Sequence, residues 1–302
     1  MKIMAKTFSE SEKKIINMFQ PKTTFDYKGK TYKVTLAGKP TCKKGEPKTD
    51  IYIEAHNILT SERTEFKISF KKQNADFLEN KTNAERAAQL LGDNWSSIIS
   101  TATENLRANF EERPLIYKNK FKRTEAGAIT LGWKFELLNK ASGELSSDMS
   151  LTHAQVVDVY AGTNLSSEKK DAIVNGTKIP GSGIANFILF EDKPINNAQE
   201  AINSLITIND YVIDHPKVYF ACKALNYRTF HQKYDGNRPL GVYVKWYVEN
   251  GKLSHKLCFK TPLVYGGHEA AKNLTDSLAQ LNIKTTDEID ETNVKDITII
   301  YQ

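Results

Sequence analysis

The sequence lacks any apolar run of the roughly 18 residues that a membrane-spanning helix requires. Its first residues, MKIMAKTFSESEKK, also lack the apolar core and the small-residue cleavage site of a secretory signal. We therefore expect a protein that resides in the cytoplasm and does not enter a membrane.

Cysteine is scarce, and no metal or nucleotide signature accompanies it. Cys42, Cys222 and Cys258 lie far apart, without a C-x-x-C pair or a histidine spacing typical of zinc. The glycine-rich stretch IPGSGIANF matches neither GxxxxGK[ST] nor GxGxxG, and a strand-like segment follows it where those motifs need a helix. These absences argue against a disulfide framework, a zinc site and a phosphate-binding loop.

Positive charge is unevenly distributed along the 302 residues. The chain carries a net charge of +6, but residues 1–81 hold 17 Lys and Arg against 10 Asp and Glu, leaving 25 against 26 for the rest. With 40% apolar residues the chain is long enough for one large α/β domain or two smaller ones. A polyanionic partner would most readily bind the basic first segment, although a solvated lysine-rich face would give the same pattern.

Periodicity predicts alternating helices and strands. Ser9 and Glu12 form a capping box before the apolar positions of TFSESEKKIINMFQ, which predicts a helix there. Two helices are expected in residues 83–114, and Asn250-Gly251 predicts a hairpin between two late strands. The pattern indicates an α/β fold, with a mixed sheet flanked by helices and further strand-rich elements toward the C-terminus. We place a boundary between residues 1–115 and 116–302, with a single domain as the alternative.

The stretch KTDIYIEAHNILTSERTEFKISFKK, residues 48–72, reads as a hairpin that turns near Thr60. Antiparallel pairing about that turn places Asp50 opposite Ser69, with Lys71 one step further on the same face. The two-residue period sends Phe66, Ile68 and Phe70 to the other face. An acid, a second oxygen ligand and a lysine would then meet at one end of the hairpin, which suits phosphodiester hydrolysis assisted by a divalent metal.

This arrangement resembles the PD-(D/E)XK nuclease family, which has the restriction-endonuclease-like fold. Thr49-Asp50 corresponds to the PD element and Ser69-Phe70-Lys71 to the acid-x-Lys element, although Pro47 stands two positions early and Ser69 replaces the usual acid. The resemblance covers about residues 8–80. It implies a nuclease that cleaves DNA internally, as restriction, phage or mobile-element enzymes do.

The same resemblance assigns roles to these residues. Asp50 and Ser69 would hold Mg²⁺, for which Mn²⁺ can substitute, and Lys71 would assist the attacking water. Glu12, from the first helix, is implied as an accessory catalytic residue and metal ligand, because it projects with the apolar face whereas Glu10 points to the side. An ordinary capping role for Glu12 is the alternative.

Two further stretches bear on this interpretation. Glu65-Phe66-Lys67 matches acid-x-Lys literally, but the same pairing sets Glu65 opposite Glu54, about 13 Å along the strand from Asp50. DNA contacts are expected from Lys72 and from the basic, aromatic loop NYRTFHQKYDGNRPL, which contributes Arg228, Lys233 and Arg238; a plain polar connection is the alternative for that loop.

The sequence is also compatible with other functions. A homodimer would allow both DNA strands to be cut. The contrasting possibility is a non-catalytic nucleic-acid-binding protein with a degenerate nuclease fold, as Ser69 would suit, and an RNA-acting relative is a third.

Overall fold

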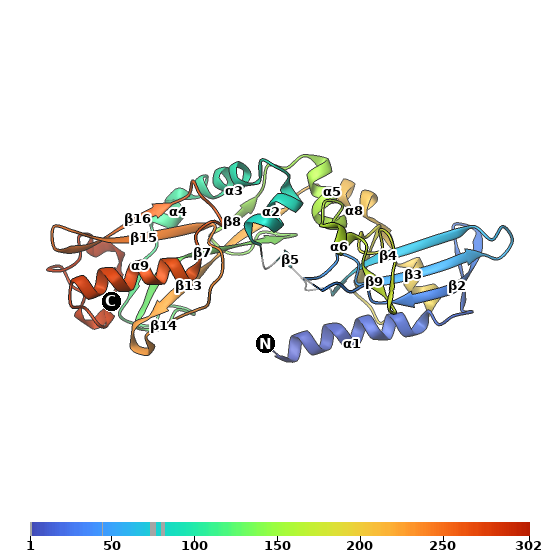
Figure 1. Ribbon diagram of the computed structural model, residues 1–302, viewed down its shortest axis with the longest axis horizontal. Coiled ribbons are helices and arrows are strands. Elements are labelled where there is room, and N and C mark those ends of the chain that lie inside the picture. Colours follow the sequence, from blue (N-terminus) through green and yellow to red (C-terminus); the bar gives the residue numbers. More distant parts are fainter. Residues whose placement is uncertain (1, 44, 73–76, 80–81) are drawn as a thin grey trace. The chain divides into compact units, whose positions relative to one another are not determined.

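The computed structural model describes residues 2–43, 45–72, 77–79 and 82–302. The chain divides into two compact units (Figure 1). Residues 1–76 and 151–217 form the first unit, and residues 77–150 and 218–302 form the second. The boundary expected between residues 115 and 116 falls inside the second unit, because the chain leaves the first unit after residue 76 and returns at residue 151.

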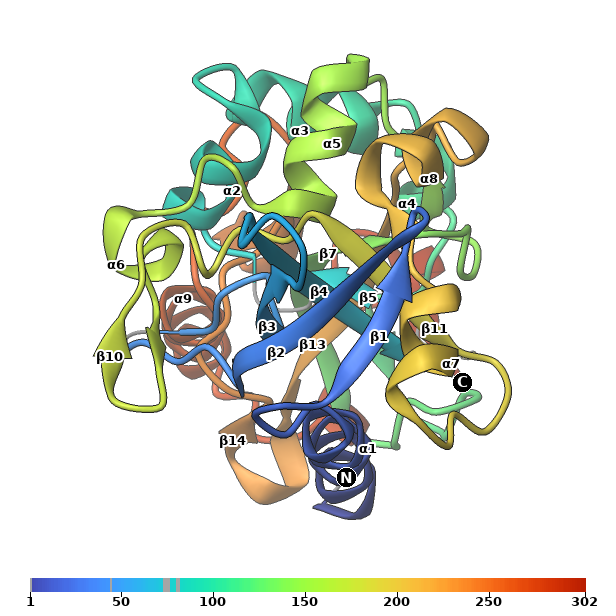
Figure 2. The ribbon, with the colours of Figure 1, turned by 90° about the vertical axis from the view of Figure 1, so that its right-hand side faces the viewer.

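The first unit is a mixed six-stranded sheet covered by helices on both faces (Figure 2). Its elements are α1 (Lys2–Met18), β1 (Thr24–Tyr27), β2 (Lys30–Gly38), β3 (Ile51–Asn57), β4 (Arg63–Lys72), α5 (His153–Ala161), α6 (Ser167–Lys170), β9 (Ile173–Val174), β10 (Thr177–Lys178), β11 (Phe187–Glu191), α7 (Ala198–Asn203), β12 (Ile206–Thr207) and α8 (Ile208–Asp214). The strand order is β1-β2-β3-β4-β11-β12, with β11 parallel to β4 and the other neighbours antiparallel. Figure 2 shows α1 and α7 on one side of the sheet and α5 and α8 on the other.

The core of this unit lies between the sheet and the α1 and α7 helices. Alternate residues of β3 and β4 point into it, among them Ile51, Ile53, Phe66 and Ile68, all fully buried. Phe66 is surrounded by the rings of Phe25, Tyr27, Tyr32 and Phe187. Ile15 of α1 and Phe19, which directly follows this helix, pack against the core. The apolar stripe of α1 therefore fixes which of its side chains reach the sheet.

The predicted register of the β3–β4 hairpin is confirmed. Ile51 pairs with Ile68, Ile53 with Phe66 and Glu54 with Glu65. Because the side-chain period of a strand is two, this register sets both faces of the hairpin at once. The hydrophobic face lies in the core, and the polar side chains line the other.

The second unit is built on a curled sheet in the order β14-β13-β7-β15-β16. Its elements are β5 (Phe77–Glu79), α2 (Ala84–Leu91), α3 (Trp95–Glu104), α4 (Arg107–Glu111), β6 (Ile116–Tyr117), β7 (Ala128–Leu138), β8 (Ser146–Asp148), β13 (Tyr219–Arg228), β14 (Lys233–Tyr234), β15 (Val242–Glu249), β16 (Lys252–Cys258), α9 (Gly267–Gln280) and β17 (Ile300–Tyr301), with short 3-10 turns at Thr229–His231, Thr286–Glu288 and Ile297–Ile299. Asn250 and Gly251, both at positive φ, form the predicted turn between β15 and β16. Fully buried Trp246 donates its indole N–H to the Thr130 carbonyl at 3.0 Å and anchors β15 in this sheet.

The expected α/β class is confirmed, since helices accompany each of the two larger sheets. One local expectation is wrong: α1 begins at Lys2, so Ser9 lies inside the helix and not at its start. The residues before Ser9 continue the helix, and a helical interior leaves no free first-turn amide for a capping hydroxyl. No helix in the described part of the chain is long and apolar enough to span a membrane.

Candidate active site

Asp50 is held at the position where β3 begins. Its backbone N–H donates to the Ile68 carbonyl at 2.8 Å, and its carboxylate Oδ2 accepts a hydrogen bond from the Phe70 N–H, also at 2.8 Å. Ser69 lies between the two residues of β4 that bond to Asp50. The carboxylate is therefore tied to the strand segment that carries Ser69 and Lys71.

The segment before Asp50 is anchored by the glycine-rich loop that precedes β11. The backbone N–H groups of Lys48 and Thr49 both donate to the Gly183 carbonyl, at 3.0 and 3.2 Å. A Cβ on Gly183 would come within 1.8 Å of the Lys169 carbonyl oxygen, so this close approach requires glycine. The stretch IPGSGIANF thus serves as a structural support for Asp50.

Ser69 and Lys71 sit in the middle of the sheet rather than at its edge. The parallel partner strand β11 sets Ile188 beside Ser69 and Phe190 beside Lys71. Ser69 is 3% exposed and Lys71 is half-buried. The neighbouring strand β11 limits the space open to the half-buried Lys71 side chain, which favours a fixed electrostatic role over a mobile surface charge.

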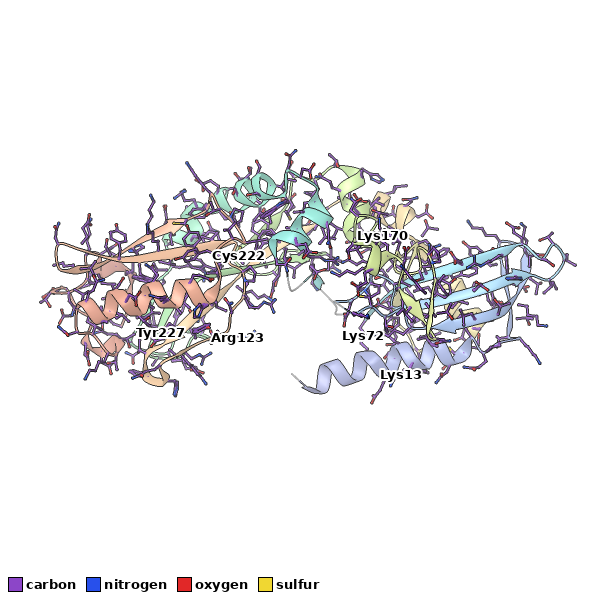
Figure 3. All side chains as sticks on the ribbon, in the orientation of Figure 1. Lys13, Lys72, Arg123, Lys170, Cys222 and Tyr227 are labelled. Atoms are coloured by element: carbon purple, nitrogen blue, oxygen red, sulfur yellow. The ribbon has the colours of Figure 1, made fainter. Side chains whose placement is uncertain are left out.

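Glu12 reaches the same end of the sheet from α1. It is 8% exposed and forms an ion pair with Lys39, which directly follows β2. Its neighbour Lys13 is exposed and points away from the sheet (Figure 3). Glu12 therefore projects with the apolar side of α1, as the sequence predicted, while its partner Lys39 was not foreseen.

Several charges interact at this site. Burial raises the pKa of Asp50, and the charges of Lys71 and Lys39 and the Phe70 hydrogen bond oppose that rise. Burial also raises the pKa of Glu12; Lys39 opposes this, while the charge of Asp50 adds to it. The two carboxylates thus lie close enough to repel each other.

Lys39 is the counter-ion that these carboxylates share. Burial alone would lower the pKa of Lys39, but the hydrogen bond and charge of Glu12, with the charges of Asp50 and Glu46, raise it. The pairing of β2 with β3, which sets Gly38 opposite Tyr52, brings Lys39 to the start of β3. Lys39 and Glu46 were missed because the sequence motif contains no position for them. The β2–β3 register was the signal that could have located Lys39.

The oxygen atoms at this site are of the kind that binds a hard divalent cation. Asp50 and Glu12 offer carboxylate oxygens and Ser69 a hydroxyl, which are the ligands that Mg²⁺ prefers. The mutual repulsion of Asp50 and Glu12 would be relieved by a cation between them. Among the described residues, no group of three or more His, Cys, Asp or Glu side chains is arranged to hold a metal ion. A metal would thus share this site with Lys39 or displace it.

The literal acid-x-Lys alternative occupies a different part of the hairpin. Glu65 accepts hydrogen bonds from Tyr52 at 2.5 Å and from Arg63 at 2.7 Å, and it pairs with Glu54 across the hairpin. The Lys67 ammonium lies 3.9 Å from the Glu65 carboxylate. These contacts engage Glu65 and Lys67 in a local ion-pair network away from Asp50.

The expected DNA-contacting residues are divided between the two units. Lys72 ends β4 in the first unit (Figure 3), whereas Arg228, Lys233 and Arg238 belong to the second. Arg228 forms ion pairs with Glu125 and with Asp235, the latter at 2.8 Å, so its charge is neutralised locally. Lys233 is exposed on β14 and Arg238 is half-buried.

No protein-family model, no curated protein and no solved structure matches this chain.

Proposed function

We propose that the first unit is a metal-dependent nuclease site that hydrolyses phosphodiester bonds in DNA. The observation that carries this proposal is the hydrogen bond from the Phe70 N–H to Asp50, which holds a carboxylate beside Ser69 and Lys71 at one end of the β3–β4 hairpin. The similarity to the PD-(D/E)XK pattern in the sequence supports the same reading.

The chemistry assigns each side chain a distinct task. Asp50 and Glu12, with Ser69, would hold Mg²⁺ or Mn²⁺, which supplies positive charge that polarises the phosphate. Lys71, half-buried beside Phe190 of β11, would stabilise negative charge that develops on the phosphate and orient the attacking water. Lys39 would neutralise the two carboxylates until the cation arrives.

The wider context of the proposal is an enzyme that acts on DNA in the cytoplasm. Lys72, which follows Lys71 at the end of β4, would contact the phosphate backbone, and Lys233 and Arg238 would add contacts from the second unit. Assembly as a homodimer would supply one site for each DNA strand.

Cleavage of supercoiled plasmid tests the proposal. The purified protein is incubated with Mg²⁺ or Mn²⁺, beside an EDTA control and the Asp50→Ala and Lys71→Ala variants. Metal-dependent nicking or linearisation that both variants lose would support the site. Lys67→Ala is a matched control, because Lys67 lies on the same face of β4 but pairs with Glu65. Equal cleavage by all variants would exclude this site.

A non-catalytic DNA-binding protein is the second candidate. Two observations favour it: Ser69 stands where an acid would serve as a stronger ligand, and Lys39 already neutralises Glu12. Salt-sensitive binding of DNA without cleavage of modified or unmodified substrates would select this candidate.

A further inference from the structure

The second unit contains a cavity of about 660 Å³ lined by α4, by the end of the β15–β16 hairpin and by Asp296 and Ile299. This volume lies within the range of small-molecule sites, roughly 300 to 1,000 Å³. Phe110, Leu115 and Phe259 give it an apolar floor and are all buried. All the residues that line the cavity belong to the second unit.

Arg107 forms a fixed planar surface at this cavity. Its guanidinium carbon lies 4.3 Å from the centroid of the Phe259 ring. Glu104 and Glu111 hold the same guanidinium through ion pairs at 2.6 and 3.1 Å. The side chain is nevertheless 43% exposed. A guanidinium plane that is immobilised on one side and open on the other can stack against a nucleobase.

Positive charge at the cavity is left available for an anion. Lys256 and Lys260 line it, are exposed, and form no ion pair with any residue that the structure describes. The Nε–H of Arg113 is buried, and within the described ranges no group accepts a hydrogen bond from it. Lys245, directly opposite Lys256 on β15, adds to the positive potential without lining the cavity.

Polar groups at the cavity can both donate and accept hydrogen bonds. Burial lowers the pKa of His255, and the charge of Asp296 only partly opposes this, which favours the neutral imidazole. A neutral imidazole offers one donor and one acceptor, and the Thr261 hydroxyl offers both. The edge of a nucleobase presents the same mixture.

We propose that this cavity binds one nucleotide, with the base against Arg107 and the phosphate between Lys256 and Lys260. The ligand would be either a free mononucleotide or an unstacked nucleotide within a DNA strand, since both present a base and a phosphate. The inference goes beyond the proposed nuclease function and does not require the first unit to be catalytic.

Titration of the wild-type protein with the 5′-monophosphate of 2-aminopurine deoxyribonucleoside tests this, because stacking quenches the fluorescence of the base. We expect saturable quenching. Lys256→Ala and Lys260→Ala should each weaken binding about tenfold, the loss of one charge-assisted contact. Lys245→Ala is the matched control and should change affinity less than about twofold, since a screened surface charge contributes little.

The outcomes separate the site from general electrostatic attraction. Absence of saturable quenching, or equal losses in the Lys245 and Lys256 variants, would overturn the proposal. Where the expected pattern is found, competition by an unlabelled single-stranded oligonucleotide identifies a DNA strand as the source, and lack of competition identifies the free nucleotide. Asp50→Asn changes the candidate active site of the first unit and should bind this nucleotide as wild type does. Nucleotide binding and DNA cleavage can therefore succeed or fail independently of each other.

Discussion

The carboxylate of Asp50 accepts a hydrogen bond from the backbone N–H of Phe70 at 2.8 Å, which joins the start of β3 to the end of β4. Phe70 is 4% exposed, so its N–H has little access to water. Burial raises the pKa of the same carboxyl group and so disfavours its charged form, whereas the charge of Lys71 lowers this pKa. Asp50 therefore combines a structural bond with a charge that the fold disfavours.

Substitutions of Asp50 should separate these two roles. Asp50→Asn keeps an oxygen acceptor for the Phe70 N–H and removes the charge, so the folded protein should be at least as stable as wild type. Asp50→Ala leaves that N–H unpaired and should lower the free energy of unfolding by about 1–3 kcal/mol. Both should abolish cleavage. Urea unfolding and plasmid cleavage measure the two effects; a destabilised Asn variant would show that the charge itself is stabilising.

The pH dependence of stability follows from the two raised carboxyl pKa values. A carboxyl whose pKa is higher in the folded state binds protons more tightly there, so its contribution favours folding at low pH and is lost as pH rises through the folded value. Burial is the leading cause for both Asp50 and Glu12. Wild type should therefore lose stability relative to an Asp50→Asn, Glu12→Gln double variant as pH increases from the ordinary carboxyl range to the raised values.

Denaturant unfolding of wild type and of the double variant at a series of pH values checks this expectation. The quantity compared is the difference in unfolding free energy between wild type and the double variant, because other titrating groups cancel in that difference. A difference that is constant with pH would show that neither pKa is shifted by folding.

Lys39 should control the response of the protein to a divalent cation. Lys39→Met removes the counter-ion of Glu12 and should cost about 1 kcal/mol at neutral pH, a modest loss because the Lys39 side chain is 44% exposed. Added Mg²⁺ should then raise the melting temperature more in the variant than in wild type, since the cation binds the folded state without displacing an ammonium. Lys33→Met is the control, because Lys33 is an exposed lysine on β2, the strand that Lys39 follows. An equal response to Mg²⁺ in all three proteins would contradict the shared site.

We expect the Glu65-Phe66-Lys67 element to contribute to the structure of the hairpin and not to cleavage. Glu65→Gln weakens the bonds to Tyr52 and Arg63, so the pKa of Tyr52, which burial and Glu65 raise, should fall toward its ordinary value. Cleavage should stay within about twofold of wild type, because Glu65 pairs with Glu54 and not with Asp50. Spectroscopic titration of tyrosine and plasmid cleavage measure both. A large loss of cleavage would instead favour the Glu65-Lys67 alternative.

The hairpin was predictable because its information is local. A turn near Thr60 and a strict two-residue period determine which residues of β3 and β4 face each other, so the Ile51–Ile68 register follows from a short stretch of sequence. The burial of Glu12 followed from the helical period in the same way.

The rest depended on contacts distant in sequence. β11 joins the first sheet beside β4 after the chain has built part of the second unit, and no local pattern at Phe187–Glu191 specifies that partner. The proximity of Lys39 to Glu12 likewise arises from packing of α1 against the sheet, since the two residues lie on separate elements. The support of Asp50 by Gly183 combines residues from two chain segments for the same reason.

Lys71 offers the most direct test of the central claim, that Asp50 and Lys71 form a hydrolytic site. The measurement is the single-turnover rate of cleavage of a labelled DNA duplex with Mg²⁺, for wild type, Lys71→Arg and Lys67→Arg. Lys71 is half-buried beside β11, so the larger planar guanidinium should misplace the charge and slow cleavage about 100-fold or more. Lys67→Arg should cleave like wild type. Equal rates for the Lys71 and Lys67 variants, or no cleavage by wild type while DNA binding is retained, would contradict the account.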